Sequence, residues 1–290
     1  MNLYGEVLEN VSLKDYNTYK IGGKTRYLVK PYNIDSLKEL LNYIKNNNMK
    51  YMIIGNGSNI ILPDSDYNGV VILLSKLNEI KIDENTVNAF CGVPLTYFVN
   101  ELVKNNLGGL ESLSGIPGTL GGAIFNNAGC YGQTISDKLD SVTYLENGEI
   151  KTINKEECNF SYRDSIFKQN KNFIILSAKF KLNYKNKEEM INTIKENMIK
   201  RNTSQPLNYP NAGSVFRNPT GYSAGKLIED AGLKNYHING AYVSDKHANF
   251  IINKDNASSA DIIELIEYIQ KEISEKYNIK LKLEQEIIKY

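Results

Sequence analysis

The sequence has little cysteine, no long apolar run and almost no net charge. Its three cysteines, Cys91, Cys130 and Cys158, are an odd number without CxxC spacing, which argues against a disulfide framework or a zinc site. We therefore expect no metal centre and a reducing, cytoplasmic location. The longest apolar runs, such as Gly69–Leu74, fall far short of the ~20 residues that span a bilayer, and the N-terminal segment lacks the basic-then-apolar pattern of a signal peptide.

The charge of the chain indicates no macromolecular partner, and its histidines indicate no nucleophilic triad. The 34 Lys and Arg residues nearly balance the 33 Asp and Glu residues, for a net charge of +1, so there is no basic field for nucleic acid or an anionic membrane. We expect no obligate protein partner. The two histidines are His237 and His247. A Gly-x-Ser-x-Gly nucleophile is absent, and His247 is expected to be a hydrogen-bonded structural residue.

One stretch is rich in glycine and free of charge. Leu113–Gly132 reads LSGIPGTLGGAIFNNAGCYG, and no charged side chain occurs between Glu111 and Asp137. Glycine is used where the backbone needs a positive φ or where another group approaches it closely. We expect a large ligand to lie against this backbone. The alternative is tight packing of small residues.

A second glycine loop, Gly55–Asn59, follows an apolar strand predicted over Tyr51–Ile54. Successive backbone N–H groups in such a turn can form an anion-binding concavity, although an ordinary turn has the same composition. The spacing matches neither a GxGxxG dinucleotide fingerprint nor a phosphate loop with Gly-Lys-Ser/Thr. Taken together, the two loops could hold a pyrophosphate or a flat heterocycle.

Hydrophobic periodicity predicts an α+β chain. Near Asn186 the chain changes from a strand-rich part with the glycine loops to a compact α+β part. An Asn147-Gly148 hairpin and a capping box at Ser258 and Asp261 are predicted. The expected helices cover 35–48, 94–105, 187–201, 222–231 and a segment from 258. The expected strands cover 51–54, 60–62, 70–74, 80–83, 86–90, 142–145, 149–153, 173–182, 241–243, 249–253 and a final half-buried strand from 279.

Three further segments carry candidate reacting side chains. Arg163 lies in NFSYRDSIFK, and its permanent positive fork suits a carboxylate or phosphate, unless it forms only a surface salt bridge. Ser214, bracketed by prolines in QPLNYPNAGSVFRNP, could donate a proton or could simply form a turn. Glu284 and Glu286 share a face near the C-terminus and could face a cleft or solvent.

Together these motifs resemble the UDP-N-acetylenolpyruvoylglucosamine reductase family. The resemblance extends over nearly the whole chain, from YKIGG to LEQE. GNGSN, SGIPGTLGGAIFNNAGCYG, YRDS, AGSVFRNP, AGKLIEDAGLK and HANFIIN occur in the family's order. Each motif alone is weak, but the ordered set is specific.

The resemblance implies a p-cresol methylhydroxylase-type FAD-binding module. Its two α+β subdomains would cover residues 1–75 and 76–186. A C-terminal α+β substrate-binding domain would cover 187–290, with a final strand that could return towards the flavin. The implied FAD-binding residues are Ile54, Gly55, Asn56, Gly57, Ser58, Asn59, Gly115, Ile116, Pro117, Gly118, Gly121, Gly122 and Ala123.

The implied reaction is NADPH-dependent reduction of UDP-N-acetylglucosamine enolpyruvate to UDP-N-acetylmuramate, in peptidoglycan synthesis. NADPH would first reduce FAD and leave, and the flavin would then pass hydride to the enolpyruvyl group. Arg163 and Glu286 would stabilise the resulting enolate, and Ser214 would protonate the carbon. Tyr162, Arg217 and Asn218 would contact the substrate. The alternatives are another oxidoreductase with the same FAD module, or a non-catalytic flavin or UDP-sugar binder.

The sequence departs from the long form of the family. Between Arg163 and Ser214 there is no room for the inserted loop whose tyrosine closes over the uridine diphosphate. A basic phosphate contact is replaced near Gln205, and Lys200 and Arg201 are candidate substitutes. No histidine precedes His237, which excludes a covalent histidine link to FAD in the glycine-loop subdomains. Cys130 is the alternative attachment point, and FAD is expected to be non-covalent.

Overall fold

The computed structural model describes all residues, 1–290, and they form two compact units that are discontinuous in sequence. The first unit comprises Met1–Leu8, Tyr27–Asn56 and Gly69–Lys200. The second comprises Glu9–Arg26, Gly57–Asn68 and Arg201–Tyr290. The units therefore do not follow chain order, and the three functional ranges expected from the sequence stay a prediction.

The first unit is built on two sheets. One is a four-stranded sheet in the order β1-β2-β5-β3, where β3 and β5 run parallel; residues 9–12, 24–26 and 67–68 of its strands group with the second unit. The other is an antiparallel five-stranded sheet in the order β12-β11-β13-β7-β6. These strands are β1 (Gly5–Ser12), β2 (Lys24–Pro31), β3 (Tyr51–Ile54), β5 (Tyr67–Leu73), β6 (Ile80–Asp83), β7 (Thr86–Phe90), β11 (Leu139–Glu146), β12 (Glu149–Asn154) and β13 (Ile174–Lys181).

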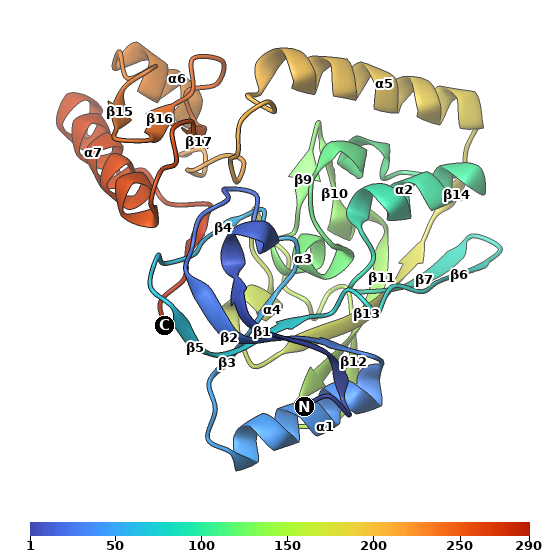
Figure 1. Cartoon of the computed structure of the whole chain (residues 1–290). Helices are drawn as coiled ribbons and strands as arrows, with labels where there is room; N and C mark the ends of the chain where they lie inside the picture. The colour runs from blue at the N-terminus through green and yellow to red at the C-terminus, as the bar shows by residue number, and fades with distance from the viewer. The chain divides into compact units, whose positions relative to one another are not determined.

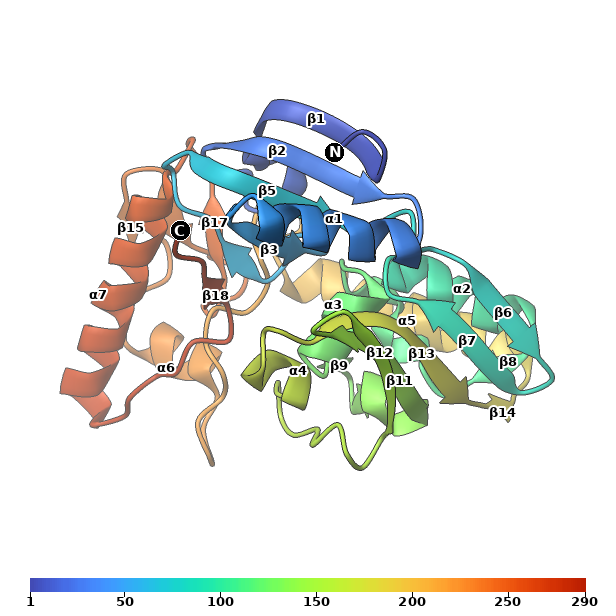
Figure 2. The ribbon, with the colours of Figure 1, turned by 90° about the horizontal axis from the view of Figure 1, so that it is seen from below.

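Helices and short pairings complete the first unit around one apolar core. Helix α1 lies along the strands β3 and β5, and its Leu37, Leu40 and Ile44 are buried in that core (Figure 2). The helical elements are α1 (Ile34–Asn46), α2 (Leu95–Lys104), η2 (Glu111–Gly115), α3 (Leu120–Phe125), η3 (Ile135–Lys138), α4 (Ile166–Gln169) and α5 (Lys187–Ser204). The short strands are β8 (Leu107–Gly108) with β14 (Asn183–Tyr184), and β9 (Gly129–Cys130) with β10 (Gln133–Thr134).

The second unit surrounds a three-stranded antiparallel sheet of β15, β16 and β17. Helix α7 packs on β15, β16 and α6 and supplies a row of buried isoleucines to the core (Figure 1). The elements are η1 (Leu13–Tyr16), β4 (Ile60–Ile61), α6 (Ala224–Asp230), β15 (His237–Ile238), β16 (Ala241–Val243), β17 (Ile251–Asn253), α7 (Ser259–Tyr277) and β18 (Glu286–Ile287).

Local signals in the sequence account for several of these elements. Ser258 and Asp261 form the expected capping box at α7, because each side chain accepts a hydrogen bond from the other residue's backbone. Asn147 and Gly148 have φ angles of 51° and 86°, as the tight turn between β11 and β12 requires. No helix combines the length and the apolarity needed to cross a bilayer.

The expected final strand from Ile279 is wrong. The backbone there makes isolated hydrogen bonds and no strand ladder. Lys282 O accepts from Arg217 N–H at 2.9 Å, and Leu281 O accepts from the Gln270 side chain at 2.9 Å. Regular pairing begins only at Glu286, where β18 runs parallel to β4. The alternation of apolar and polar residues from Ile279 therefore reflects alternating burial of the side chains, without strand pairing.

Candidate functional site

The two glycine segments come together in the first unit. A Cβ added to Gly55 would lie 2.7 Å from Thr119 Oγ1, so only glycine allows this approach. Thr119 is also the N-cap of α3, and its Oγ1 accepts a hydrogen bond from Gly122 N–H at 3.3 Å. The first residue of one predicted loop and the N-cap of α3, within the other glycine segment, are thus packed against each other.

Two neighbouring glycines of α3 differ in what surrounds them. A Cβ on Gly121 would lie 2.9 Å from the Cβ of Cys91, so Gly121 is needed for packing. A Cβ on Gly122 would meet only Thr119 Oγ1, at 3.5 Å, and Gly122 is exposed. Glycine in a helix costs about 1 kcal/mol relative to alanine. Nothing in the packing of the first unit explains this glycine, and a close-lying ligand would.

Residues 57–59 of the loop Gly55–Asn59 belong to the second unit. Gly57 has a φ of 63°, and a Cβ there would lie 2.6 Å from Asn17 Cα. Gly57 O accepts from Thr18 N–H at 3.2 Å, so this half of the loop is fixed on the segment after η1. At its end, Asn59 O accepts from Glu286 N–H at 2.9 Å. Asn59, a predicted cofactor-binding residue, is therefore joined through its backbone to Glu286, a predicted catalytic residue.

Arg163 occupies a strained position in a tight turn. Ser161 and Asp164 exchange backbone hydrogen bonds of 3.1 and 3.2 Å, which leaves Tyr162 and Arg163 as the two central residues. Arg163 has a φ of 57°, a left-handed conformation that is uncommon for a long side chain. Its guanidinium lies 5.3 Å from the centre of the Tyr162 ring and donates to Gly129 O at 2.8 Å. Strain of this kind is typical of functional sites.

This turn is fastened to the second glycine segment by side chains. Asn127 Nδ2 donates to Ser161 O at 2.9 Å, and Ser165 Oγ donates to Phe125 O at 2.7 Å. Lys168 Nζ donates to Asn126 Oδ1 at 2.7 Å and to Arg163 O at 3.4 Å. The second glycine segment thus anchors the turn that carries Arg163.

Ser214 lies in a backbone segment that is held on both edges. On one edge Val215 N–H donates to Asn249 O at 2.9 Å, and the Asn249 side chain exchanges hydrogen bonds of 3.0 and 2.8 Å with the backbone of Phe216. On the other edge Glu284 N–H donates to Val215 O at 2.8 Å. The Ser214 hydroxyl itself makes no hydrogen bond, so it is available to a substrate.

The three residues predicted to contact the substrate differ in their exposure and in the hydrogen bonds that they already make. Tyr162 is 53% exposed. Arg217 is anchored by its backbone N–H on Lys282 O. Asn218 uses its Oδ1 to accept from Ala224 N–H at 3.0 Å, which leaves its amide N–H groups as donors.

Sequence reasoning missed several residues that position this site, among them Gln285, Asn127 and Asn249. Each acts through hydrogen bonds to backbone far away in the sequence, and no local pattern announces such contacts. His247 is more predictable. Its Nδ1 accepts from Asn249 N–H at 3.2 Å, and burial lowers the pKa of its imidazole and so favours the neutral acceptor. His247 thus helps to hold Asn249.

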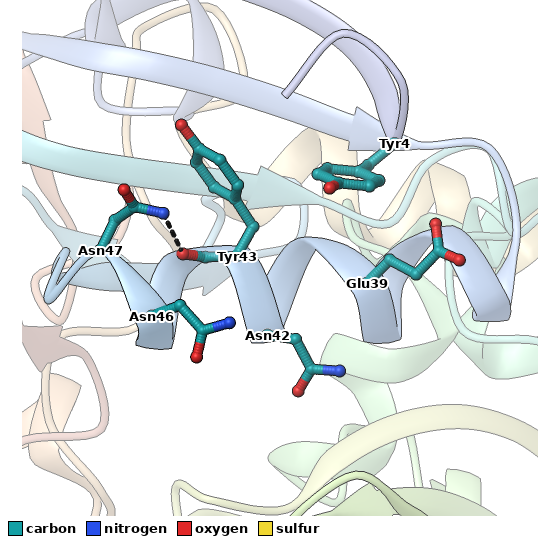
Figure 3. A pocket seen from close by; sticks show the side chains of 6 residues that line it. All are labelled: Tyr4, Glu39, Asn42, Tyr43, Asn46 and Asn47. Atoms are coloured by element: carbon teal, nitrogen blue, oxygen red, sulfur yellow. Dashed lines mark hydrogen bonds between the residues drawn. The ribbon is translucent and has the colours of Figure 1, made fainter.

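A separate hollow lies beside α1 in the first unit. Asn42 and Asn46 project from the helix, Tyr4 and Tyr43 lie above it, and Asn47 donates to Tyr43 O (Figure 3). Glu39 is the remaining lining residue of this shallow space of about 420 Å³. None of the residues singled out in the sequence lines it, and it has no cluster of reacting groups.

Comparison with known proteins gives a consistent result. Residues 25–154 match the family model of an FAD binding domain, and residues 205–288 match that of the UDP-N-acetylenolpyruvoylglucosamine reductase C-terminal domain. The reductase of Clostridium novyi is 41% identical over 98% of this chain and 92% of its own. That of Carboxydothermus hydrogenoformans is 45% identical over 97% and 94%.

The same similarity is found among solved structures. The crystal structure of UDP-N-acetylenolpyruvylglucosamine reductase from Thermus caldophilus superposes with a TM-score of 0.82 and 31% identity, over 98% of this chain and 99% of the other. The relatives are matched over nearly their whole length, and the two family models cover both glycine segments, Ser214 and Glu286. The chain therefore belongs to the UDP-N-acetylenolpyruvoylglucosamine reductase family.

Proposed function

We propose that this enzyme uses NADPH and FAD to reduce the enolpyruvyl group of UDP-N-acetylglucosamine enolpyruvate, which gives UDP-N-acetylmuramate for peptidoglycan synthesis. The observation that carries the proposal is the similarity to reductases of this name over almost the entire chain. The FAD-domain match covers both glycine segments, and the C-terminal match covers Ser214 and Glu286.

The residues of the first unit fit a large flat cofactor. Gly122 is exposed on α3 with open space beside it, and Gly55 abuts Thr119 at the start of the same helix. Asn127 adds a buried Oδ1 without a hydrogen-bond partner close to the arginine turn. We assign FAD binding to Ile54–Asn59, Gly115–Gly118 and Gly121–Ala123. When bound, FAD supplies the two-electron redox chemistry that links NADPH to the substrate.

Arg163 and Glu286 are proposed to stabilise negative charge on the substrate. Reduction of the vinyl carbon leaves an electron pair on the neighbouring carbon, and this pair delocalises into the substrate carboxylate. Preorganised charges aimed at such a developing enolate are usually the largest source of rate enhancement. Support comes from the hydrogen bond that holds the Arg163 guanidinium on Gly129 O, and from the hydrogen bond that holds the Glu286 backbone on Asn59 O.

Ser214 is proposed to complete the reduction by moving its Oγ proton to that carbon. The hydroxyl has no partner within the protein, and its backbone is held on both edges. Tyr162, Arg217 and Asn218 are proposed to bind the rest of the substrate. Lys200 and Arg201, at the end of α5, are proposed phosphate contacts.

The partition of the chain is part of the same proposal. Residues 1–75 and 76–186 would act as the two FAD-binding subdomains and 187–290 as the substrate-binding domain. We also propose a cytoplasmic location, because all three cysteines are free and such thiols persist in a reducing compartment.

The spectrum of the purified protein tests the proposal. We expect a yellow protein, or a colourless one that takes up FAD on titration, whose NADPH oxidation depends on the enolpyruvyl sugar and yields the lactyl ether. Failure to take up FAD would contradict the proposal as a whole. FAD uptake with no reaction towards the enolpyruvyl sugar would favour a non-catalytic binder or another flavin oxidoreductase.

A further inference from the structure

Gln285 is a buried polar residue between the two acidic residues of the C-terminal segment. It is 3% exposed, whereas Glu284 and Glu286 on either side are partly exposed. A buried amide must find hydrogen-bond partners, because an unsatisfied polar group in the interior costs free energy. Gln285 finds three, all within the second unit.

The three partners join two separate parts of the chain to Gln285. Its Nε2 donates to Ala212 O and to Gly213 O, each at 3.1 Å. Its Oε1 accepts from the hydroxyl of Tyr19 at 3.1 Å. Tyr19 is fully buried, and burial raises the pKa of its hydroxyl, which therefore stays protonated and able to donate.

The carbonyl groups that Gln285 holds belong to the two residues before Ser214. Gly213 has a φ of 74°, and no atom lies within 4 Å of where a Cβ would be, so this glycine is required by its conformation alone. Gln285 therefore fixes the chain before Ser214, while Asn249 and Glu284 fix Val215 after it. The rotation of the Ser214 hydroxyl is then the main freedom left at this position.

The same residue sets the position of Glu286. Glu284 N–H is bonded to Val215 O, and Glu286 N–H is bonded to Asn59 O at 2.9 Å. Gln285 lies between these two anchors in the chain, and its side chain is bonded to the Ser214 turn. One side chain thus links the backbone of the proposed proton donor to that of the proposed charge-stabilising glutamate.

We propose that Gln285, held by Tyr19, is a positioning residue that keeps Ser214 and Glu286 in register for protonation of the substrate carbon. This inference rests on the proposed function, since it assigns no chemistry of its own to Gln285. The buried pair acts on the half-reaction that consumes the enolpyruvyl substrate and leaves the half-reaction with NADPH unaffected.

Two variants and one control test this role. Gln285→Met removes all three hydrogen bonds at similar volume, and Tyr19→Phe removes only the hydroxyl. Ile21→Val is the control, because Ile21 is 1% exposed in the same core and takes no part in the network through its side chain. Each FAD-loaded protein is reduced with NADPH without oxygen and then mixed with the enolpyruvyl substrate in H₂O and in D₂O.

We expect both variants to bleach with NADPH at the wild-type rate and to be reoxidised about ten-fold or more slowly, with an increased solvent isotope effect. The double variant should be no slower than Gln285→Met, because both act through one network. If Gln285→Met does not fold, Tyr19→Phe alone still decides the matter.

Two outcomes would overturn the proposal. Wild-type reoxidation rates in the variants would show that the network has no part in catalysis. Equal slowing of both half-reactions would show a purely structural role. So would reoxidation of the control Ile21→Val that is slowed as much as that of the two variants. Failure of the proposed function is distinguishable from either, because the wild-type enzyme itself would then not be reoxidised by the enolpyruvyl sugar.

Discussion

At the scale of single residues, Ser214 is the clearest test of the chemistry. Its hydroxyl makes no hydrogen bond, so Ser214→Ala removes the proposed proton donor without leaving a buried group unpaired. We expect reduction by NADPH and the melting temperature to stay near wild type, while reoxidation by the enolpyruvyl substrate slows ~10²-fold or more. Rapid-mixing absorbance measurements separate the two steps. Equal slowing of both would make Ser214 a structural residue.

Gly122 tests the proposed cofactor site. Gly122→Val places a side chain on an exposed face of α3 whose nearest neighbour is Thr119 Oγ1. We expect the apoprotein to fold and its affinity for FAD to fall at least about ten-fold, equivalent to about 1.4 kcal/mol. Gly121→Ala is a useful comparison, since its Cβ would press on Cys91 and should lower the stability of the apoprotein itself. A Gly122→Val protein replete with FAD would show that the loop is misassigned.

At the scale of elements, the turn that carries Arg163 depends on its fastening. Lys168 donates to Asn126 and to Arg163 O, and loss of this amine should loosen the left-handed turn. We expect Lys168→Met to slow reoxidation by the substrate about ten-fold, with little effect on reduction by NADPH, because the guanidinium is less well preorganised. Lys168→Arg is the matched control that keeps the charge. Unchanged reoxidation in Lys168→Met would remove this role.

The short helix η2 before the glycine segment is anchored by a buried carboxylate. The Glu111 side chain is 1% exposed, pairs with Lys185 at 3.1 Å and accepts from Gly109 N–H at 3.0 Å. Burial alone would raise the pKa of Glu111, but backbone hydrogen bonds, Lys185 and Gln133 outweigh it and hold the pKa below the ordinary value of 4.5. The stabilisation is therefore complete above that value and is lost as pH falls through the lower, folded-state pKa.

Glu111→Gln should accordingly destabilise the protein in a pH-dependent way. We expect a loss of about 1–3 kcal/mol in the free energy of unfolding near neutral pH, and a smaller difference from wild type at acidic pH, as the wild-type carboxyl becomes protonated. Denaturant titrations at the two pH values measure this difference. A difference that does not change with pH would mean that the charge of Glu111 contributes nothing.

Elements that are encoded by neighbouring residues could be predicted from the sequence, and elements that depend on distant contacts could not. The Asn147-Gly148 turn and the Ser258 cap are encoded within a few residues, and both were predictable. The strand β1 was missed, because much of it is exposed and its sequence has no clear alternation. The segment from Ile279 was misread, because its alternating burial arises from contacts with Phe216 and α7.

At the scale of the whole molecule, each compact unit combines segments that lie far apart in the chain. Residues 9–26 and 57–68 group with the C-terminal part, although they lie among segments of the first unit in the chain. The hydrogen bonds that cause this grouping in the second unit, such as those of Tyr19 with Gln285 and Asn59 with Glu286, join residues more than two hundred positions apart. Periodicity reports only on near neighbours, so it could not find them.

The most direct test of the account is a two-stage reaction without oxygen. The FAD-loaded enzyme is first bleached with one equivalent of NADPH, freed of nicotinamide, and then mixed with UDP-N-acetylglucosamine enolpyruvate. We expect full return of the flavin absorbance and stoichiometric formation of UDP-N-acetylmuramate. A reduced enzyme that stays bleached with this substrate, and is reoxidised only by oxygen, would contradict it.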